Sequence, residues 1–377
     1  MIYRLRFLGK FLRRKRRCFK KIISQIRCFI FYKFYKYKNT RPKVSIIIPF
    51  YNSAATMERC LRCVVNSVGV PHEIICVDDG STDKSPLIVK RFQKSCFYDN
   101  FRLIRLGENK GLFHARMAGI QAAQGEYIGF LDSDDLVSDD YFDNLYSTAS
   151  RERADIAVGR VVNQTFDGKR YIQTRCAVFP YPPDEDYNYK NAAELNLESL
   201  FWNQEGRCYH FHVVWNKLYK ADILRDCLKI LSGFQVGHLV MMEDFLYSLV
   251  WFSRIQTFAL ARPADYYYIE NPASSIRAKT GERVKKNLLD IQKAFQCAED
   301  YLIKSGKTEK YGRNLREWKN LYGRIWRRNL AGLPPEDFKS CQSVFLDIFE
   351  SDGDIGEDRD ADEYYYKKAE WIGEANI

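Results

Sequence analysis

Val44-Ser-Ile-Ile-Ile-Pro-Phe50 is a continuous apolar run that is rich in β-branched residues. Such a run is typical of a strand that is buried on both faces of a sheet. Apolar residues then recur every three or four positions over residues 57–68, which predicts a helix. Glu73-Ile-Ile-Cys-Val77 follows as a second short buried strand, so this part of the chain has the strand, helix, strand order of a parallel sheet.

The alternation of strands and helices continues further along the chain. Phe101-Arg-Leu-Ile-Arg105 and Tyr127-Ile-Gly-Phe-Leu131 predict two more strands, and Gly111 begins a helix between them. We therefore expect an α/β fold, with a mostly parallel, Rossmann-like sheet flanked by helices. Ligands of such sheets bind outside the carboxyl ends of the strands.

Charge separates the N-terminal arm from the rest of the 377-residue chain. Residues 1–43 contain 16 Lys and Arg and no Asp or Glu, whereas the whole chain carries +11, so the remainder is mildly acidic at −5. A nucleic-acid-binding enzyme domain is usually basic, so we expect no nucleic-acid partner. At about 100–200 residues per domain, the length predicts two or three units.

The arm alternates its cations with aromatic residues, as in Cys28-Phe-Ile-Phe-Tyr-Lys-Phe-Tyr-Lys-Tyr37. It has no apolar run of about 18 residues for a spanning helix, and Arg13 to Arg17 interrupts any signal-peptide core. Cations with aromatic anchors suit an anionic membrane surface, which predicts a cytoplasmic protein that is peripheral on the inner face of the cell membrane. The alternative is a solvated basic tail that binds polyanions non-specifically.

Cysteine usage agrees with a reducing compartment. The 11 cysteines are scattered singly among apolar neighbours, which suits small buried side chains better than a disulfide framework. The close pair in Cys60-Leu-Arg-Cys63 lies inside a predicted helix without a partner pair, so we expect neither a zinc nor a redox site there.

Asp132-Ser-Asp-Asp135 directly follows the fourth predicted strand. Alternate carboxylates at a strand end suit Mg²⁺ or Mn²⁺, which prefer oxygen ligands and keep positions for substrate phosphates. The alternative is an N-cap cluster for a helix near Val137. Asp78-Asp79-Gly80-Ser81 after the second strand could bind a nucleotide base or could equally cap a helix.

Five segments in order resemble the family 2 glycosyltransferases over residues 42–160. They are Val44-Ser-Ile-Ile-Ile-Pro-Phe-Tyr-Asn52, Val77-Asp-Asp-Gly-Ser-Thr-Asp83, Asn109-Lys-Gly111, Gly125-Glu-Tyr-Ile128 and Leu131-Asp-Ser-Asp-Asp135. The resemblance implies the GT-A fold, inverting transfer of a sugar from a nucleoside-diphosphate donor (UDP-sugar foremost) to an acceptor hydroxyl, and a divalent metal, Mn²⁺ or Mg²⁺. It also implies a role in surface polysaccharide or glycan assembly, with a glycan or lipid-linked acceptor.

The resemblance also implies roles for individual residues. Asp134 is the expected principal metal ligand, Asp132 contacts the metal, donor sugar or ribose, and Asp135 supports the metal or caps the next helix. The remaining expected nucleotide-sugar-binding residues are Pro49, Tyr51 and Asn52 at the nucleoside, Asp79 and less readily Asp78 at the base, and Lys110 and Arg116 near the base or diphosphate. Arg116 could equally lie on a helix surface.

Met241-Met-Glu-Asp-Phe245 matches the acidic element of the same family. An inverting transfer needs one general base, and the resemblance assigns it to Asp244, with Glu243 as its neighbour and a possible acceptor ligand. Taken alone, the pair would read as acidic residues that begin a helix. Arg277, in the loop Asn271-Pro-Ala-Ser-Ser-Ile-Arg277, is a further candidate near the diphosphate.

The expected organisation is a basic arm (1–42), a nucleotide-sugar half (43–160), an acceptor and base half (161–280) and a helical extension with an acidic tail (281–377). A nucleotidyltransferase would share the sheet and the metal. It would need a Gly-rich basic loop after the first strand, where Tyr51-Asn-Ser-Ala-Ala55 stands instead. A catalytically inactive sugar-nucleotide-binding or scaffold protein is the other alternative, and the retained acidic residues argue against it.

Overall fold

The computed structural model describes residues 40–96, 100–166, 170–177, 201, 212–270 and 280–349. Most of the basic arm, the candidate Arg277 and the acidic segment after Phe349 lie outside these ranges, so the expectations about them stay predictions. Within the described ranges, no helix combines the length and the apolar character that crossing a membrane requires.

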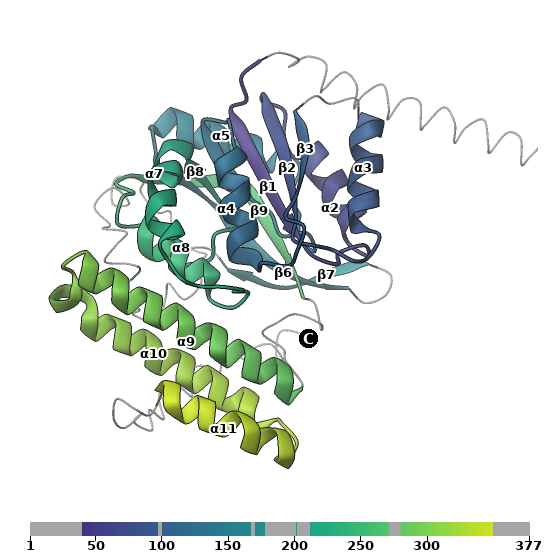
Figure 1. The fold of residues 1–377 in the computed structure, drawn as a ribbon. Helices are drawn as coiled ribbons and strands as arrows, with labels where there is room; N and C mark the ends of the chain where they lie inside the picture. The colour runs from purple at the N-terminus through teal and green to yellow at the C-terminus, as the bar shows by residue number, and fades with distance from the viewer. Residues whose placement is uncertain are drawn as a thin grey trace, which may run out of the picture.

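Four parallel strands form the part of the sheet that the sequence predicted. Strand β1 (Val44–Phe50) lies between β2 (His72–Asp78) and β4 (Tyr127–Phe130). Strand β3 (Phe101–Arg105) lies beyond β2 (Figure 1). The chain moves outward from β1 to β3 and then returns to the other side of β1. The loops after β1 and β4 therefore diverge at a switch in strand order, where α/β sheets bind ligands.

The second half of the chain extends the same sheet rather than forming another. Strand β8 runs antiparallel to β4 and to β6, and β9 runs parallel to β6. The described strands form one nine-stranded sheet, which is completed by β5 (Leu136–Val137), β6 (Ile156–Phe166), β7 (Tyr171–Ala177), β8 (Lys217–Lys220) and β9 (Phe258–Ile269). The expected boundary at residue 160 falls inside β6, so the two halves share one sheet.

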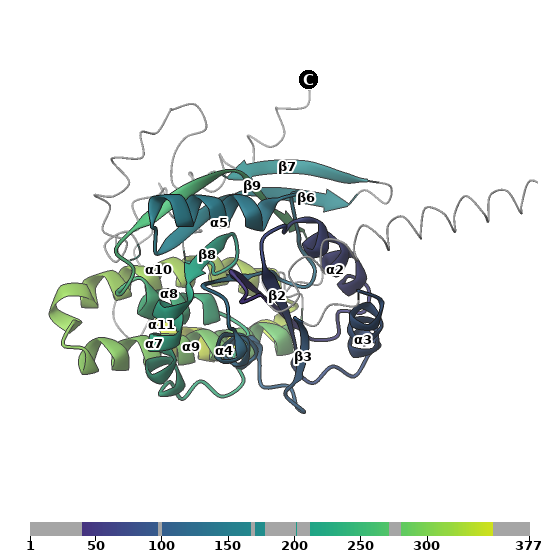
Figure 2. The ribbon, with the colours of Figure 1, turned by 90° about the horizontal axis from the view of Figure 1, so that it is seen from above.

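Helices cover both faces of the sheet (Figures 1 and 2). Alternate residues of β1 show this directly, because Ile47 packs in the core under α4 and α8 while Ile46 and Ile48 pack in the core under α2 and α5. One face carries α2 (Met57–Asn66), α3 (Ser85–Cys96) and α5 (Tyr141–Glu152), and the other carries α4 (Leu112–Ala122), α7 (Ala221–Ser232) and α8 (Glu243–Trp251). The predicted α/β class is confirmed.

The expected helical extension is also present. It consists of α9 (Gly281–Lys304), α10 (Thr308–Ala331) and α11 (Pro335–Phe349), which pack on one another below α8 (Figure 1). Phe245 of α8 meets Trp318 of α10 at a ring separation of 5.1 Å and Phe295 of α9 at 5.8 Å. The extension therefore shares its core with the helix that carries the Glu-Asp pair.

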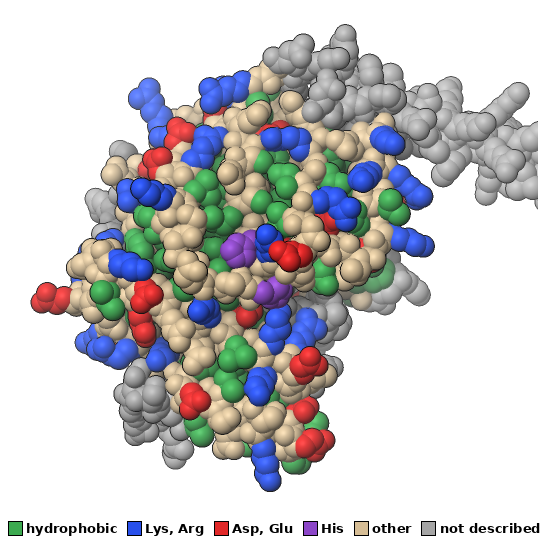
Figure 3. All heavy atoms as spheres, viewed as in Figure 1, with side chains coloured by type: hydrophobic (Ala, Val, Ile, Leu, Met, Phe, Trp, Pro, Cys, Tyr) green, Lys and Arg blue, Asp and Glu red, His purple; other side chains and the backbone are tan. Residues whose placement is uncertain are grey.

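Charged side chains are dispersed over the face seen in Figure 3. Lys and Arg side chains lie among Asp, Glu and neutral residues there, and those drawn in colour form no large cationic patch on that face. Cys60 and Cys63 of α2 are free thiols, and burial raises the pKa of Cys63 to about 11.

Candidate active site

Asn52 joins the loops that follow β1 and β2. Its backbone has a φ of +49°, and its side-chain Oδ1 accepts hydrogen bonds from the backbone N–H groups of Thr82 at 2.8 Å and Asp83 at 3.2 Å. The amide of Asn52 donates to the Ser81 hydroxyl at 3.0 Å. Asn52 therefore fixes the loops, whereas the neighbouring Tyr51 has 45% of its surface exposed and is available to a ligand.

Asp79 is committed to the loop that precedes α4. Its two carboxylate oxygens accept the backbone N–H groups of Lys110 at 2.8 Å and Gly111 at 2.9 Å. Burial raises the pKa of Asp79, and these two hydrogen bonds oppose that shift. Gly111 has a φ of +90°, and an added Cβ would lie 2.5 Å from the carbonyl oxygen of Leu239. This loop therefore needs both the carboxylate of Asp79 and a glycine.

Asp78 has no role in capping a helix. It is fully buried, and its carboxylate accepts the N–H of Ser81 at 2.8 Å and the Nε–H of Arg105 at 2.8 Å. Helix α3 is instead started by Asp83, which accepts the N–H of Ser85 at 2.9 Å. Pro49 is buried within β1.

The Asp132–Asp135 segment does not cap a helix near Val137 either, because α5 begins at Tyr141. Asp135 is buried, and its carboxylate accepts the Tyr266 hydroxyl at 2.8 Å and the Ile269 N–H at 2.8 Å. Burial raises the pKa of Asp135 well above its ordinary value. Its two oxygens thus join this loop to β9, while the side chain of Asp134 is only partly buried.

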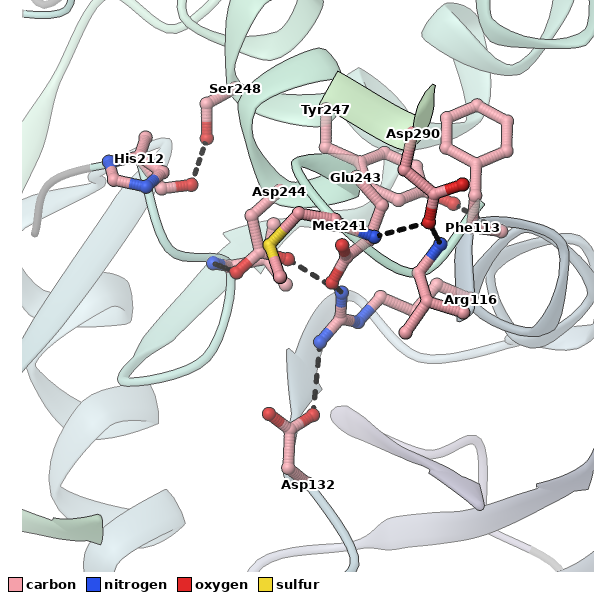
Figure 4. A network of polar contacts seen from close by, with 12 residues as sticks. Phe113, Arg116, Asp132, His212, Met241, Glu243, Asp244, Tyr247, Ser248 and Asp290 are labelled. Carbon is pink, nitrogen blue, oxygen red and sulfur yellow. Dashed lines mark hydrogen bonds and ion pairs between the residues drawn. The ribbon is translucent and has the colours of Figure 1, made fainter. Parts of the chain in front are cut away.

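Arg116 of α4 is the centre of the polar network in Figure 4. Its side chain is 1% exposed, which excludes the expected alternative of a helix-surface residue. Nη2 donates to Asp132 Oδ1 at 3.0 Å, and Nη1 donates to Glu243 Oε1 at 2.8 Å and to Asp244 Oδ1 at 2.6 Å. One guanidinium therefore joins the carboxyl end of β4 to the N-terminus of α8.

Three carboxylates around one guanidinium leave this site short of positive charge. Burial would lower the pKa of Arg116, but Asp244, Asp132 and Glu243 raise it well above its ordinary value. Burial and then the charge of Asp244 raise the pKa of Glu243 to about 8, although Arg116 opposes this. The site therefore has the electrostatics that favour a further cation or a bound proton.

Asp244 has a second contact and remains reachable. Its Oδ2 accepts the N–H of Val214 at 3.3 Å, and its side chain is 14% exposed compared with 9% for Glu243. Both residues lie in the first turn of α8, where acidic side chains are favoured by the helix dipole. Glu243 and Asp244 therefore begin a helix and also belong to the candidate site, so the two interpretations of this pair are compatible.

Lys217, Tyr266 and Asp290 contribute to the site or its support and were not predicted. Burial lowers the pKa of Lys217 to about 7, and its Nζ donates to the carbonyl of Val213 at 2.7 Å and to Oδ1 of Asn216 at 2.7 Å. The sequence shows Lys217 between strand-like residues and Asp290 beside the apolar residues of α9. These positions are unusual for charged residues, but they do not indicate which groups Lys217 and Asp290 contact.

The expected site residues fall into two groups. Arg116, Asp132, Glu243 and Asp244 are brought together by direct contacts. Of the others that the structure describes, Pro49 lies within β1, Asp78 ends β2, and the rest belong to the loops at the strand ends, where Lys110 directs its Nζ to Glu108 at 3.5 Å. Arg277 lies outside the described residues. Among the described residues, no cluster of three or more His, Cys, Asp or Glu side chains could hold a metal ion by itself.

Comparison with known proteins identifies the family. Residues 45–224 match the family model Glycosyl transferase family 2. EpsH of Bacillus subtilis (strain 168), which is named among the glycosyltransferases, is 30% identical over 277 residues that cover 73% of each chain. The poly(ribitol-phosphate) beta-glucosyltransferase of Bacillus spizizenii is 39% identical over 231 residues, covering 60% of this chain and 32% of that protein.

A solved structure of S. aureus TarS residues 1–349 in complex with UDP-GlcNAc is 18% identical, covers 81% of this chain and 89% of that one, and gives a TM-score of 0.48. The sequence relationship to EpsH extends well beyond the segment that the family model matches. The chain therefore belongs to glycosyl transferase family 2 and is a glycosyltransferase.

Proposed function

We propose that this chain transfers a sugar from a nucleoside-diphosphate donor to an acceptor hydroxyl with inversion, and that Asp244 is the general base. One observation supports this above the others. The guanidinium of Arg116 contacts both Asp132 at the end of β4 and Asp244 at the start of α8. A donor-side and an acceptor-side carboxylate therefore lie within the span of one side chain.

The donor side of the proposal uses the loops after β1, β2 and β4. Exposed Tyr51 offers a face on which a nucleoside can stack, and Asp79 is the carboxylate proposed for the base. Asp78 is the weaker candidate because it is fully buried and its carboxylate is ion-paired with Arg105 as well as accepting the Ser81 N–H. The half-exposed Lys110 can reach toward a diphosphate, and a UDP-sugar is the proposed donor.

The carboxylates at the end of β4 could hold a divalent metal together with the phosphates of the nucleotide sugar. Mg²⁺ is usually bound by one or two carboxylates together with substrate phosphates, so a protein-only cluster of three ligands is not required. Asp134 and Asp132 would hold Mn²⁺ or Mg²⁺, whereas Asp135 supports the loop through Tyr266 and Ile269. When bound, the metal would neutralise charge on the departing diphosphate.

The chemical step is a single displacement. The acceptor oxygen forms a bond to the anomeric carbon of the sugar, the bond from that carbon to the phosphate oxygen breaks, and the diphosphate leaves with the electron pair. The acceptor proton passes to the carboxylate of Asp244, which Arg116 and the N–H of Val214 hold in place. Glu243 is the proposed acceptor contact beside it.

The acceptor class is proposed from chemistry and kinship together. The relative from Bacillus spizizenii is named for a poly(ribitol-phosphate) acceptor. We propose a glycan or lipid-linked acceptor in surface polysaccharide assembly, with the basic arm (residues 1–42) on the anionic inner face of the membrane. The 15 Lys and Arg of that segment, without any Asp or Glu, support this placement.

A panel of nucleotide sugars with Mn²⁺ and candidate acceptors tests the proposal through release of nucleoside diphosphate. Asp244→Asn should lower turnover by about 10²–10⁴-fold while donor affinity is kept. Asp222→Asn is the matched control, because Asp222 is an exposed acid that pairs with Arg225 away from the site. If the wild-type protein bound a donor but transferred its sugar to none of the acceptors, an inactive binding protein would be favoured instead.

A further inference from the structure

The segment that precedes the Glu-Asp pair is held by a residue of the helical extension. Asp290 of α9 is 6% exposed, and its Oδ2 accepts the backbone N–H of Val240 at 3.0 Å and that of Met241 at 3.1 Å. Figure 4 shows the contact of Asp290 with the backbone of Met241. The chain then turns at Met242, which has a φ of +64°, and α8 begins with Glu243.

The same segment also touches the donor-side loop. The carbonyl of Leu239 accepts the N–H of Phe113 at 3.4 Å, and it lies against Gly111. Nε2 of His114 lies 2.9 Å from the carbonyl oxygen of Gly237. The loop of residues 233–242 therefore lies between the donor-side loop and α9, and its last residues place the two acids on Arg116.

Asp290 is a carboxylate buried among apolar residues of α9. Its neighbours on α9, Leu288 and Ile291, are fully buried in the core that the extension shares with α8. A carboxylate in such surroundings is unfavourable unless it is hydrogen-bonded. The two N–H groups of the loop supply those bonds, and they would themselves lose their partner without it.

We infer that Asp290 is a positioning residue, through which the helical extension fixes the loop that presents Glu243 and Asp244. The inference rests on the proposed role of Asp244 as general base. It gives the extension a function in catalysis that does not require it to touch the substrate. Losing the two hydrogen bonds would leave the turn at Met242, whose φ is +64°, with fewer restraints.

The test compares Asp290→Ala, Asp290→Asn and Asp337→Ala. Asp337 of α11 accepts the N–H of Gly281 at 2.9 Å, so it ties the extension together without touching the loop. We expect Asp290→Ala to lower kcat by about 10–100-fold with unchanged affinity for UDP, since misplacement by about 1 Å can cost 10²-fold. Asp290→Asn keeps an acceptor oxygen and should recover much of that loss, while Asp337→Ala should lower Tm but keep kcat.

Amide hydrogen exchange at Val240 and Met241 provides a readout that needs no substrate. Both amides should lose protection in Asp290→Ala and keep it in Asp337→Ala. Equal kcat losses in Asp290→Ala and Asp337→Ala, or unchanged protection at both amides, would overturn the inference. Full turnover by Asp244→Asn would instead overturn the proposed base, and the exchange result would still decide whether Asp290 holds the loop.

Discussion

At the scale of single residues, Arg116 carries the electrostatic balance of the site. Its removal in Arg116→Met would leave three carboxylates without their shared cation. Breaking a buried ion pair from one side costs about 3–5 kcal/mol. We expect the free energy of unfolding, measured with urea, to fall by this amount in Arg116→Met. Arg116→Lys keeps the charge and should lower it less.

Arg160→Met is the control for Arg116, because Arg160 pairs with Asp265 but is itself 45% exposed. Pairs of this kind contribute about 0–1 kcal/mol. A similar loss of stability for both methionine variants would contradict the central role of Arg116.

Glu243 should make stability depend on pH. Burial and the charge of Asp244 raise its pKa in the folded protein to about 8 from an ordinary value of 4.5, so the folded state holds a proton that the unfolded state has released. Its contribution is therefore complete below pH 4.5 and is lost as pH rises toward about 8. Glu243→Gln cannot titrate, so its Tm should fall less than that of the wild type across this window. Parallel Tm profiles would show that Glu243 does not titrate there.

At the element level, the donor-side loop depends on its packing against the loop before α8. Gly107 and Gly111 both have positive φ, at +83° and +90°, but only Gly111 has Leu239 against it. Gly107→Ala should cost about 1–2 kcal/mol for its backbone conformation alone. Gly111→Ala should cost more, because a φ of +90° with a ψ of 161° is a conformation that essentially only glycine adopts and because the added Cβ meets Leu239. It should also weaken UDP binding, because it displaces the N–H groups that Asp79 accepts. Unfolding in urea and calorimetry with UDP measure both, and equal effects would show that the two loops do not depend on this contact.

At the scale of the whole molecule, charge divides the protein into a basic arm and a mildly acidic body. We expect full-length protein to sediment with vesicles of anionic lipid and a variant lacking residues 1–39 to remain in solution. High salt should remove the difference, because it screens surface charge. Vesicles of neutral lipid are the control, and equal sedimentation of both forms with anionic vesicles would contradict the proposed role of the arm.

Local sequence patterns were enough to predict the first four strands, the helices between them, and the polar residues at the strand ends. These features depend on local patterns, and β1 and β3 begin and end where those patterns predicted, at Val44–Phe50 and Phe101–Arg105. The order of motifs along residues 44–135 was sufficient for the family, since these loops must meet wherever the sheet forms.

The contacts between the side chains of the site depend on how distant elements pack in the folded chain. Arg116 meets Glu243 across 127 positions of sequence, and Asp290 meets Met241 across 49. No local pattern encodes such pairs, because they depend on how α4, α8 and α9 stack on one face of the sheet. For the same reason, the local pattern at Asp135 predicted a metal ligand or a helix cap but could not predict the hydrogen bonds that its oxygens accept from Tyr266 and Ile269 of β9.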